Sequence, residues 1–109
     1  MDGPVEEFFV DARPGSVAVG GEVDMETAER LRDALAQACA SAEPQVEVDM
    51  SQVSFIDSSG INELLRISQN GCRVIVTGMS ATVARTFTLL GLDQVFDLTS
   101  STIADGTTP

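Results

Sequence analysis

The sequence predicts a single α/β domain built on a mixed sheet of four to five strands. Short β-branched strand patterns alternate with longer helical patterns along 109 residues, and 43% of these residues are hydrophobic while 21% are charged. The first two strands are separated only by a turn and the later ones by helices, which gives the order β-β-α-β-α-β-α-β. We expect the domain to span residues 1–98, followed by a short polar tail over residues 99–109.

The first third of the chain predicts a hairpin and then a helix. Residues 6–11 and 16–20 form the hairpin strands, because Arg13-Pro14-Gly15 between them supplies turn chemistry. The helix begins after Asp24, whose side chain suits an N-cap. Its apolar face recurs at steps of three and four residues and consists of Met25, Ala28, Leu31, Leu35, Ala38 and Cys39.

A strand and a second helix follow. Residues 46–50 alternate apolar and acidic side chains, as a half-buried strand does. Ser51-Gln52 predicts a turn, after which the apolar residues up to Ile56, Phe55 included, return to the core. The second helix runs from about Ser58 to Gln69, and Asn70-Gly71 ends it because both residues tolerate the left-handed conformation.

The last third of the chain predicts a central strand, a third helix and a short final strand. Residues 72–77 are mostly β-branched, Ser80 caps the helix that follows, Gly91 closes it, and Val95-Phe96 forms the last strand. Because parallel strands place the helix starts along one edge of the sheet, Asp24 and Asp57 should lie close together there.

Charge and histidine content exclude several classes of function. Seventeen acidic residues face six arginines, giving a formal charge of −11. Phosphate backbones and anionic membranes attract clustered basic side chains, so this balance argues against nucleic acid and membrane surfaces as partners. A basic protein partner and simple solubility both stay open. The chain has no histidine, which removes the usual general base and the commonest metal ligand. We therefore expect no enzyme, no cofactor and no metal.

The two cysteines and the N-terminal sequence indicate in which cellular compartment the protein is expected. Cys39 and Cys72 lack CxxC spacing and predict small buried hydrophobes in a reducing compartment. A redox role would require the two to come within disulfide distance. The sequence shows no signal peptide and no membrane-spanning run, which favours the cytoplasm.

The run Asp57-Ser58-Ser59-Gly60 carries more polar groups than a helix cap requires. One side chain suffices for capping, at about 1 kcal/mol, and a glycine inside a helix costs up to about 1 kcal/mol relative to alanine. Ordinary capping is one interpretation. A phosphorylated serine at this helix start is the other, since it adds a charge of about −1.5 to −2 without refolding the domain.

The stretch from Val48 to Ile61, which reads VDMSQVSFIDSSGI, resembles the central motif of the STAS domain, above all in the stand-alone anti-sigma factor antagonists of bacteria. The resemblance extends to Gly21-Glu22-Val23-Asp24 and to the stretch from Ser80 to Phe96. It implies a STAS-like fold and a protein that binds an anti-sigma factor, itself a serine kinase, and so releases a sigma factor.

The resemblance also implies a role for each residue of the motif. The kinase phosphorylates Ser58 and so releases the antagonist, and a serine phosphatase restores it. Asp57 orients the Ser58 hydroxyl, Ser59 and Gly60 shape the helix start, and Asp24 is a neighbouring partner contact. ATP and Mg²⁺ belong to the partner kinase. Ser59 remains a second candidate for the modified residue.

One other function stays open from the sequence. A STAS scaffold or sensor in a signalling complex, without the phosphorylation switch, would not need the Ser58 hydroxyl and could be redox-modulated through Cys39 and Cys72. The oligomeric state does not follow from the sequence.

Overall fold

A computed structural model describes residues 7–39 and 44–98 of the chain. The predicted tail over residues 99–109 lies outside the described residues, so the predicted domain boundary stays a prediction.

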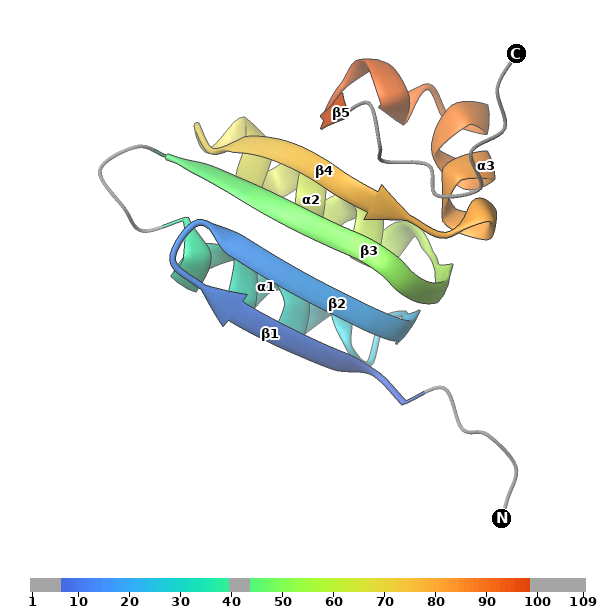
Figure 1. The fold of residues 1–109 in the computed structure, drawn as a ribbon, viewed down its shortest axis with the longest axis horizontal. Coiled ribbons are helices and arrows are strands. Elements are labelled where there is room, and N and C mark those ends of the chain that lie inside the picture. Colours follow the sequence, from blue (N-terminus) through green and yellow to red (C-terminus); the bar gives the residue numbers. More distant parts are fainter. Residues whose placement is uncertain (1–6, 40–43, 99–109) are drawn as a thin grey trace.

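A five-stranded mixed sheet forms the framework of the domain (Figure 1). The strands follow one another across the sheet in chain order, with β1 antiparallel to β2 and all other neighbours parallel. They are β1 (Phe9–Arg13), β2 (Ser16–Val23), β3 (Gln45–Ile56), β4 (Arg73–Met79) and β5 (Asp97–Leu98). The predicted α/β class, element order and mixed sheet are confirmed.

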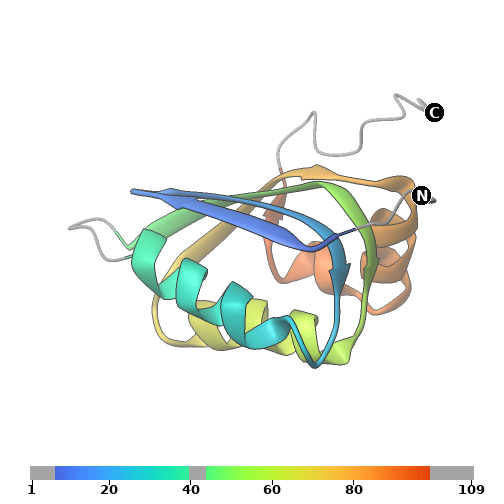
Figure 2. The same cartoon turned by 90° about the horizontal axis from the view of Figure 1, so that it is seen from below.

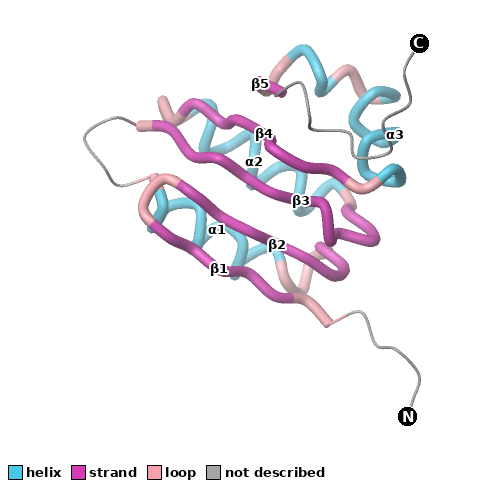
Figure 3. Tube along the Cα trace, in the orientation of Figure 1, coloured by secondary structure: helices cyan, strands magenta, loops and turns pink. Residues whose placement is uncertain are grey.

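Three α-helices and one short 3-10 helix complete the described structure. They are α1 (Ala28–Ala38), α2 (Ser58–Gln69), α3 (Ala81–Leu89) and η1 (Leu92–Gln94). Figure 2 shows α1 and α2 side by side beneath one face of the sheet, with α3 beyond the curved end of β3. Figure 3 shows how short the connection between β3 and α2 is. A single residue, Asp57, separates the two elements.

Valine and leucine side chains fill the space between the sheet and the two helices. Val46, Val48 and Met50 of β3 are fully buried while Glu47 and Asp49 are exposed, as the alternation predicted. From the helices, Leu35 of α1 and Leu64 of α2 are fully buried against this layer. Burying each of these side chains contributes about 1.5–3 kcal/mol, so this packing fixes both helices on the sheet.

The second half of β3 differs from its prediction. Ser51-Gln52 does not turn the chain, since β3 continues unbroken to Ile56. Its pairing with β2 slips twice, and at the second slip Gly21 pairs with Val53 while Glu22 pairs with Phe55. The extra residue between them reverses the inside–outside phase, as a β-bulge does. Phe55 is therefore 48% exposed instead of buried.

The first helix begins later than its prediction. α1 begins at Ala28, with Thr27 at its N-cap, because residues 24–27 form a turn. Met25 thus lies outside the helix and is 77% exposed, so its assignment to the buried face was wrong.

Both ends of the sheet are displaced from their predictions. β1 spans residues 9–13 rather than 6–11, and residue 6 lies outside the described residues. The last strand is Asp97–Leu98 rather than Val95-Phe96, because Phe96 turns inward to pack on Phe87 with the ring centroids 5.9 Å apart.

Several helix boundaries were predicted correctly. α2 has the predicted bounds, and the Ser80 hydroxyl caps α3 by accepting from the Val83 N–H at 3.3 Å. The same hydroxyl donates to the Val53 carbonyl at 2.7 Å, which ties α3 to β3. Gly91 follows α3 with a φ of +73°, the left-handed conformation that suits glycine.

A disulfide joins Cys39 and Cys72, whose Cα atoms lie 6.5 Å apart. The prediction that both cysteines are reduced was therefore wrong, while the predicted burial of Cys72 is confirmed. Cys39 directly follows α1, and Cys72 follows the Asn70-Gly71 turn after α2. The packing of the two helices side by side brings their C-terminal ends together, which the sequence spacing alone does not reveal.

We predict that reducing this disulfide lowers the free energy of unfolding by about 3–4 kcal/mol, because the bond closes a long loop in the unfolded chain. The separation is 33 residues. Urea denaturation with and without a dithiol reductant measures the difference, and the double variant Cys39→Ala/Cys72→Ala should not respond to reductant. Identical midpoints for the native chain in both conditions would contradict the prediction.

Candidate functional site

Parallel pairing of β2 with β3 builds the corner at which the predicted site residues meet. Val23 pairs with Ile56 at the ends of the two strands, and the Asp57 N–H donates to the Val23 carbonyl at 3.0 Å. Asp24 and Asp57 each follow one of these paired residues directly. The prediction that the two acids share one edge of the sheet is confirmed.

Asp57 is the N-cap of α2. Its φ and ψ are −107° and −173°, and its Oδ1 accepts from the Ser59 N–H at 2.8 Å and the Gly60 N–H at 3.4 Å. Its carbonyl accepts the first intrahelical bond, from the Ile61 N–H at 3.1 Å. These bonds satisfy amides that the helix start would otherwise leave unpaired, and they fix the direction in which Ser58 projects.

The two serines differ in exposure. Ser58 is exposed, and its hydroxyl has no hydrogen-bond partner among the residues that the structure describes. Ser59 is half-buried, its N–H is bonded to Asp57, and its side chain lines a groove between α1 and α2. Of these two serines, Ser58 is the more exposed to solvent.

Gly60 is buried beneath this corner. A Cβ at this position would come within 2.5 Å of the Val23 Cγ1 and 2.9 Å of the Ile56 Cγ1, closer than packed carbons allow. Gly60 therefore shapes the helix start, as the resemblance implied, from a buried position and not as a surface open to a partner. The glycine lets the first turn of α2 settle onto the ends of β2 and β3, and it acts from below the surface.

Asp24 holds the turn before α1. Its Oδ1 accepts from the Glu26 N–H at 3.0 Å and the Thr27 N–H at 3.3 Å, and its own N–H donates to the Thr27 hydroxyl at 2.9 Å. It stabilises this turn instead of capping the helix itself, and the exposed Met25 projects from the same turn.

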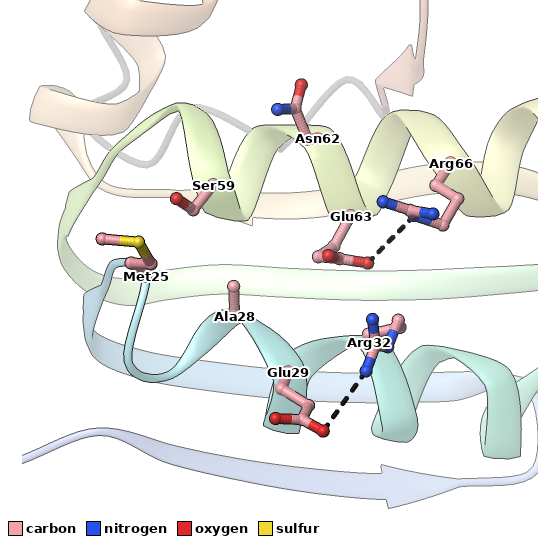
Figure 4. A pocket seen from close by; sticks show the side chains of 8 residues that line it. All are labelled: Met25, Ala28, Glu29, Arg32, Ser59, Asn62, Glu63 and Arg66. Atoms are coloured by element: carbon pink, nitrogen blue, oxygen red, sulfur yellow. Dashed lines mark ion pairs between the residues drawn. The ribbon is translucent and has the colours of Figure 1, made fainter.

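The α1–α2 groove was missed by the sequence analysis. It is an open hollow of about 390 Å³ beside Ser59, drawn in Figure 4. Its lining residues are Met25, Ala28, Glu29, Arg32, Ser59, Asn62, Glu63 and Arg66. Glu63 is the least expected of these, because its side chain is only 10% exposed. Steps of three and four residues place this acid on the inward face of α2 together with Gly60, Leu64 and Ile67. This spacing could have identified Glu63 from the sequence alone.

Within residues 7–39 and 44–98, no group of three or more His, Cys, Asp or Glu side chains is arranged to hold a metal ion. In the same ranges, none of the helices has the length and apolar character that a membrane crossing requires.

Comparison with known proteins points to one family. The family model described as "Mlab, STAS domain" matches residues 9–100. The chain is 32% identical over 88 residues to the anti-sigma-F factor antagonist RsfB of Mycobacterium tuberculosis, covering 78% of this chain and 72% of RsfB. It is 29% identical over 90 residues to the anti-sigma-B factor antagonist of Staphylococcus epidermidis, covering 79% and 83%.

A solved structure agrees with these sequence matches. The crystal structure of an anti-sigma factor antagonist from Mycobacterium paratuberculosis is similar to this chain with a TM-score of 0.65 and 31% identity, covering 86% of this chain and 85% of that one.

We predict that Asp57→Ala lowers the free energy of unfolding by about 1 kcal/mol, because two amides at the start of α2 lose their acceptor. Asp57→Asn keeps the capping oxygen and should stay close to the native chain. Ser58→Ala is the matched control, with an effect within about 0.5 kcal/mol, as for an exposed side chain without partners. Urea denaturation followed by circular dichroism measures all three. Equal stability of Asp57→Ala and the native chain would show that the cap contributes nothing.

Proposed function

The chain belongs to the STAS domain family, and on that premise we propose that it is an anti-sigma factor antagonist switched off by phosphorylation of Ser58. Two relatives named as anti-sigma factor antagonists align with most of the chain, which supports the antagonist part of the proposal. The observation that carries the proposal is the exposed Ser58 hydroxyl, which the Asp57 cap holds at the start of α2.

Exposure favours Ser58 over Ser59 as the modified residue. A kinase must bring the attacking hydroxyl within about 3–3.5 Å of the transferred phosphorus. Ser58 can be approached from solvent, whereas Ser59 is half-buried and its side chain faces the α1–α2 groove. In this proposal Asp57 orients Ser58 by fixing the backbone on both sides of it.

Electrostatics explain how one phosphate would release a partner. The positive end of the α2 dipole tolerates an added charge of about −1.5 to −2. The partner would meet that charge beside Asp24 and Asp57, on a chain whose formal charge is already −11. A surface fitted to a neutral hydroxyl would then face added bulk and repulsion, while the fold of the antagonist stays unchanged.

The partner surface around Ser58 consists of Asp24, Asp57 and Ser59 in this proposal, with Gly60 supporting them from beneath. The partner is an anti-sigma factor of the serine-kinase type that supplies ATP and Mg²⁺, and its capture frees the sigma factor. A serine phosphatase restores the hydroxyl. This places the protein in the cytoplasm, where sigma factors act, as a binding protein and as the substrate of its partner.

The Cys39–Cys72 disulfide favours a second candidate, a scaffold or sensor domain modulated by thiol redox state and independent of Ser58. Affinity for the anti-sigma factor, measured with and without a dithiol reductant, distinguishes the two functions. In a phosphorylation switch the affinity changes when Ser58 is phosphorylated, whereas in a redox-modulated scaffold it changes when the disulfide is reduced.

We predict that a serine-kinase anti-sigma factor from the same genome, purified and mixed with this protein, ATP and Mg²⁺, places one phosphate on Ser58. Mass spectrometry maps the site, which should be lost in Ser58→Ala and retained in Ser59→Ala. In binding measurements with ADP, Ser58→Asp should lower the affinity at least about tenfold, or about 1.4 kcal/mol. Phosphate retained in Ser58→Ala would remove Ser58 from this role.

A further inference from the structure

We propose that the α1–α2 groove is a second part of the partner-binding surface, in which Glu63 receives a basic side chain of the anti-sigma factor. This inference rests on the proposed function, since it names chemistry by which the same partner is recognised.

The groove is continuous along the two helices. Beyond the hollow drawn in Figure 4 lies another of about 220 Å³, and the two share Arg32, Glu63 and Arg66 as lining residues. The second hollow extends to Asn70 at the end of α2. Together they form a trough that a segment of another protein can follow.

The groove adjoins the Ser58 corner. Ser59 lines its first hollow and is the next residue after Ser58. Met25 lines the same hollow from the turn held by Asp24, and its side chain is 77% exposed. A partner bound at Ser58 can therefore extend directly into the groove, where the exposed Met25 side chain offers an apolar contact.

Glu63 lacks a hydrogen-bond donor inside the groove. Its side chain is only 10% exposed, and its buried Oε1 has no hydrogen-bond partner among the described residues. The Arg66 Nε lies 3.5 Å away, an ion pair without a good hydrogen bond. Withdrawing a carboxylate from water is costly unless donors replace the lost water, so this position is suited to an incoming donor.

The lining points to a protein partner. Pockets for small molecules are lined mainly by apolar and aromatic side chains, whereas this hollow has four charged residues among the eight that line it. Arg32 is already paired with Glu29 at 3.4 Å, and both side chains reach solvent. Among these four charged residues, Glu63 is the one whose side chain is withdrawn from water. The group that the groove lacks is therefore a hydrogen-bond donor to the Glu63 carboxylate.

A basic side chain fits this site better than a neutral donor. The formal charge of −11 attracts basic surfaces over a distance. Arg66, the present ion-pair partner of Glu63, is 60% exposed and can turn into water as the incoming lysine or arginine takes its place. Arg66 thus competes with the partner for Glu63, which gives the two residues opposite effects on binding.

Isothermal titration calorimetry with the anti-sigma factor kinase and ADP tests the proposal. We expect Glu63→Gln to weaken binding at least tenfold. We expect Arg66→Met, which keeps the apolar stem but removes the competitor, to tighten binding about threefold. The matched controls are Asp11→Asn and Arg13→Met, an exposed pair on β1 at 3.4 Å with the same charge changes, and both should bind like the native chain.

If the native chain binds and Glu63→Gln binds equally well, the groove proposal fails and the proposed function stands. If Glu63 and Arg66 only stabilise the fold, both variants unfold at lower urea with unchanged affinity, which also overturns it. If the native chain binds no serine-kinase anti-sigma factor of its genome, both proposals fail. If light scattering shows a dimer that Glu63→Gln dissociates, the occupant is a second copy and not the anti-sigma factor.

Discussion

The parallel pairing of Val23 with Ile56 is the constraint on which the rest of the site depends. It ends two neighbouring strands at the same level, so Asp24 and Asp57 leave the sheet side by side. The Asp57 N–H is bonded to the Val23 carbonyl, which leaves the Asp57 carboxylate to cap α2. Gly60 lets the first turn of α2 rest on the same two residues. Ser58 is thereby held outward on a rigid support, where a phosphate can change the surface without changing the fold.

Local signals in the sequence predicted the features that depend on neighbouring residues. The bounds of α2, the Ser80 cap and the meeting of two acids at one edge follow from capping chemistry, periodicity and chain order. The predictions were wrong where contacts between residues far apart in the sequence determine the structure. Phe55 is exposed because β3 bulges against β2, and Cys39 meets Cys72 because two helices pack side by side. Glu63 stood on the inward face of α2 in the sequence, but only the packed groove shows that its carboxylate lacks a donor.

The two helices α1 and α2 connect the Ser58 corner, the groove and the disulfide. Beyond their C-terminal ends they are joined through Cys39 and Cys72, and at the other end the groove opens beside Ser59. The disulfide thus holds the two helices together at one end, and the other end offers a proposed partner two contacts, the Ser58 corner and the groove. In the function proposed here, phosphorylation of Ser58 decides whether the partner stays bound, and in the further inference Glu63 of the groove contributes to which partner is chosen.

The claim that Ser58 acts as a switch on a preformed corner is tested most directly by comparing backbone amide chemical shifts before and after stoichiometric phosphorylation. We expect shift changes confined to the turn at residues 24–27 and the start of α2 at residues 57–62. Amides in the middle of β3 and β4 should keep their shifts and their protection from hydrogen exchange. Widespread changes across the sheet, or loss of protection in α2, would show that phosphorylation remodels the fold and that Ser58 is not a switch on a preformed corner.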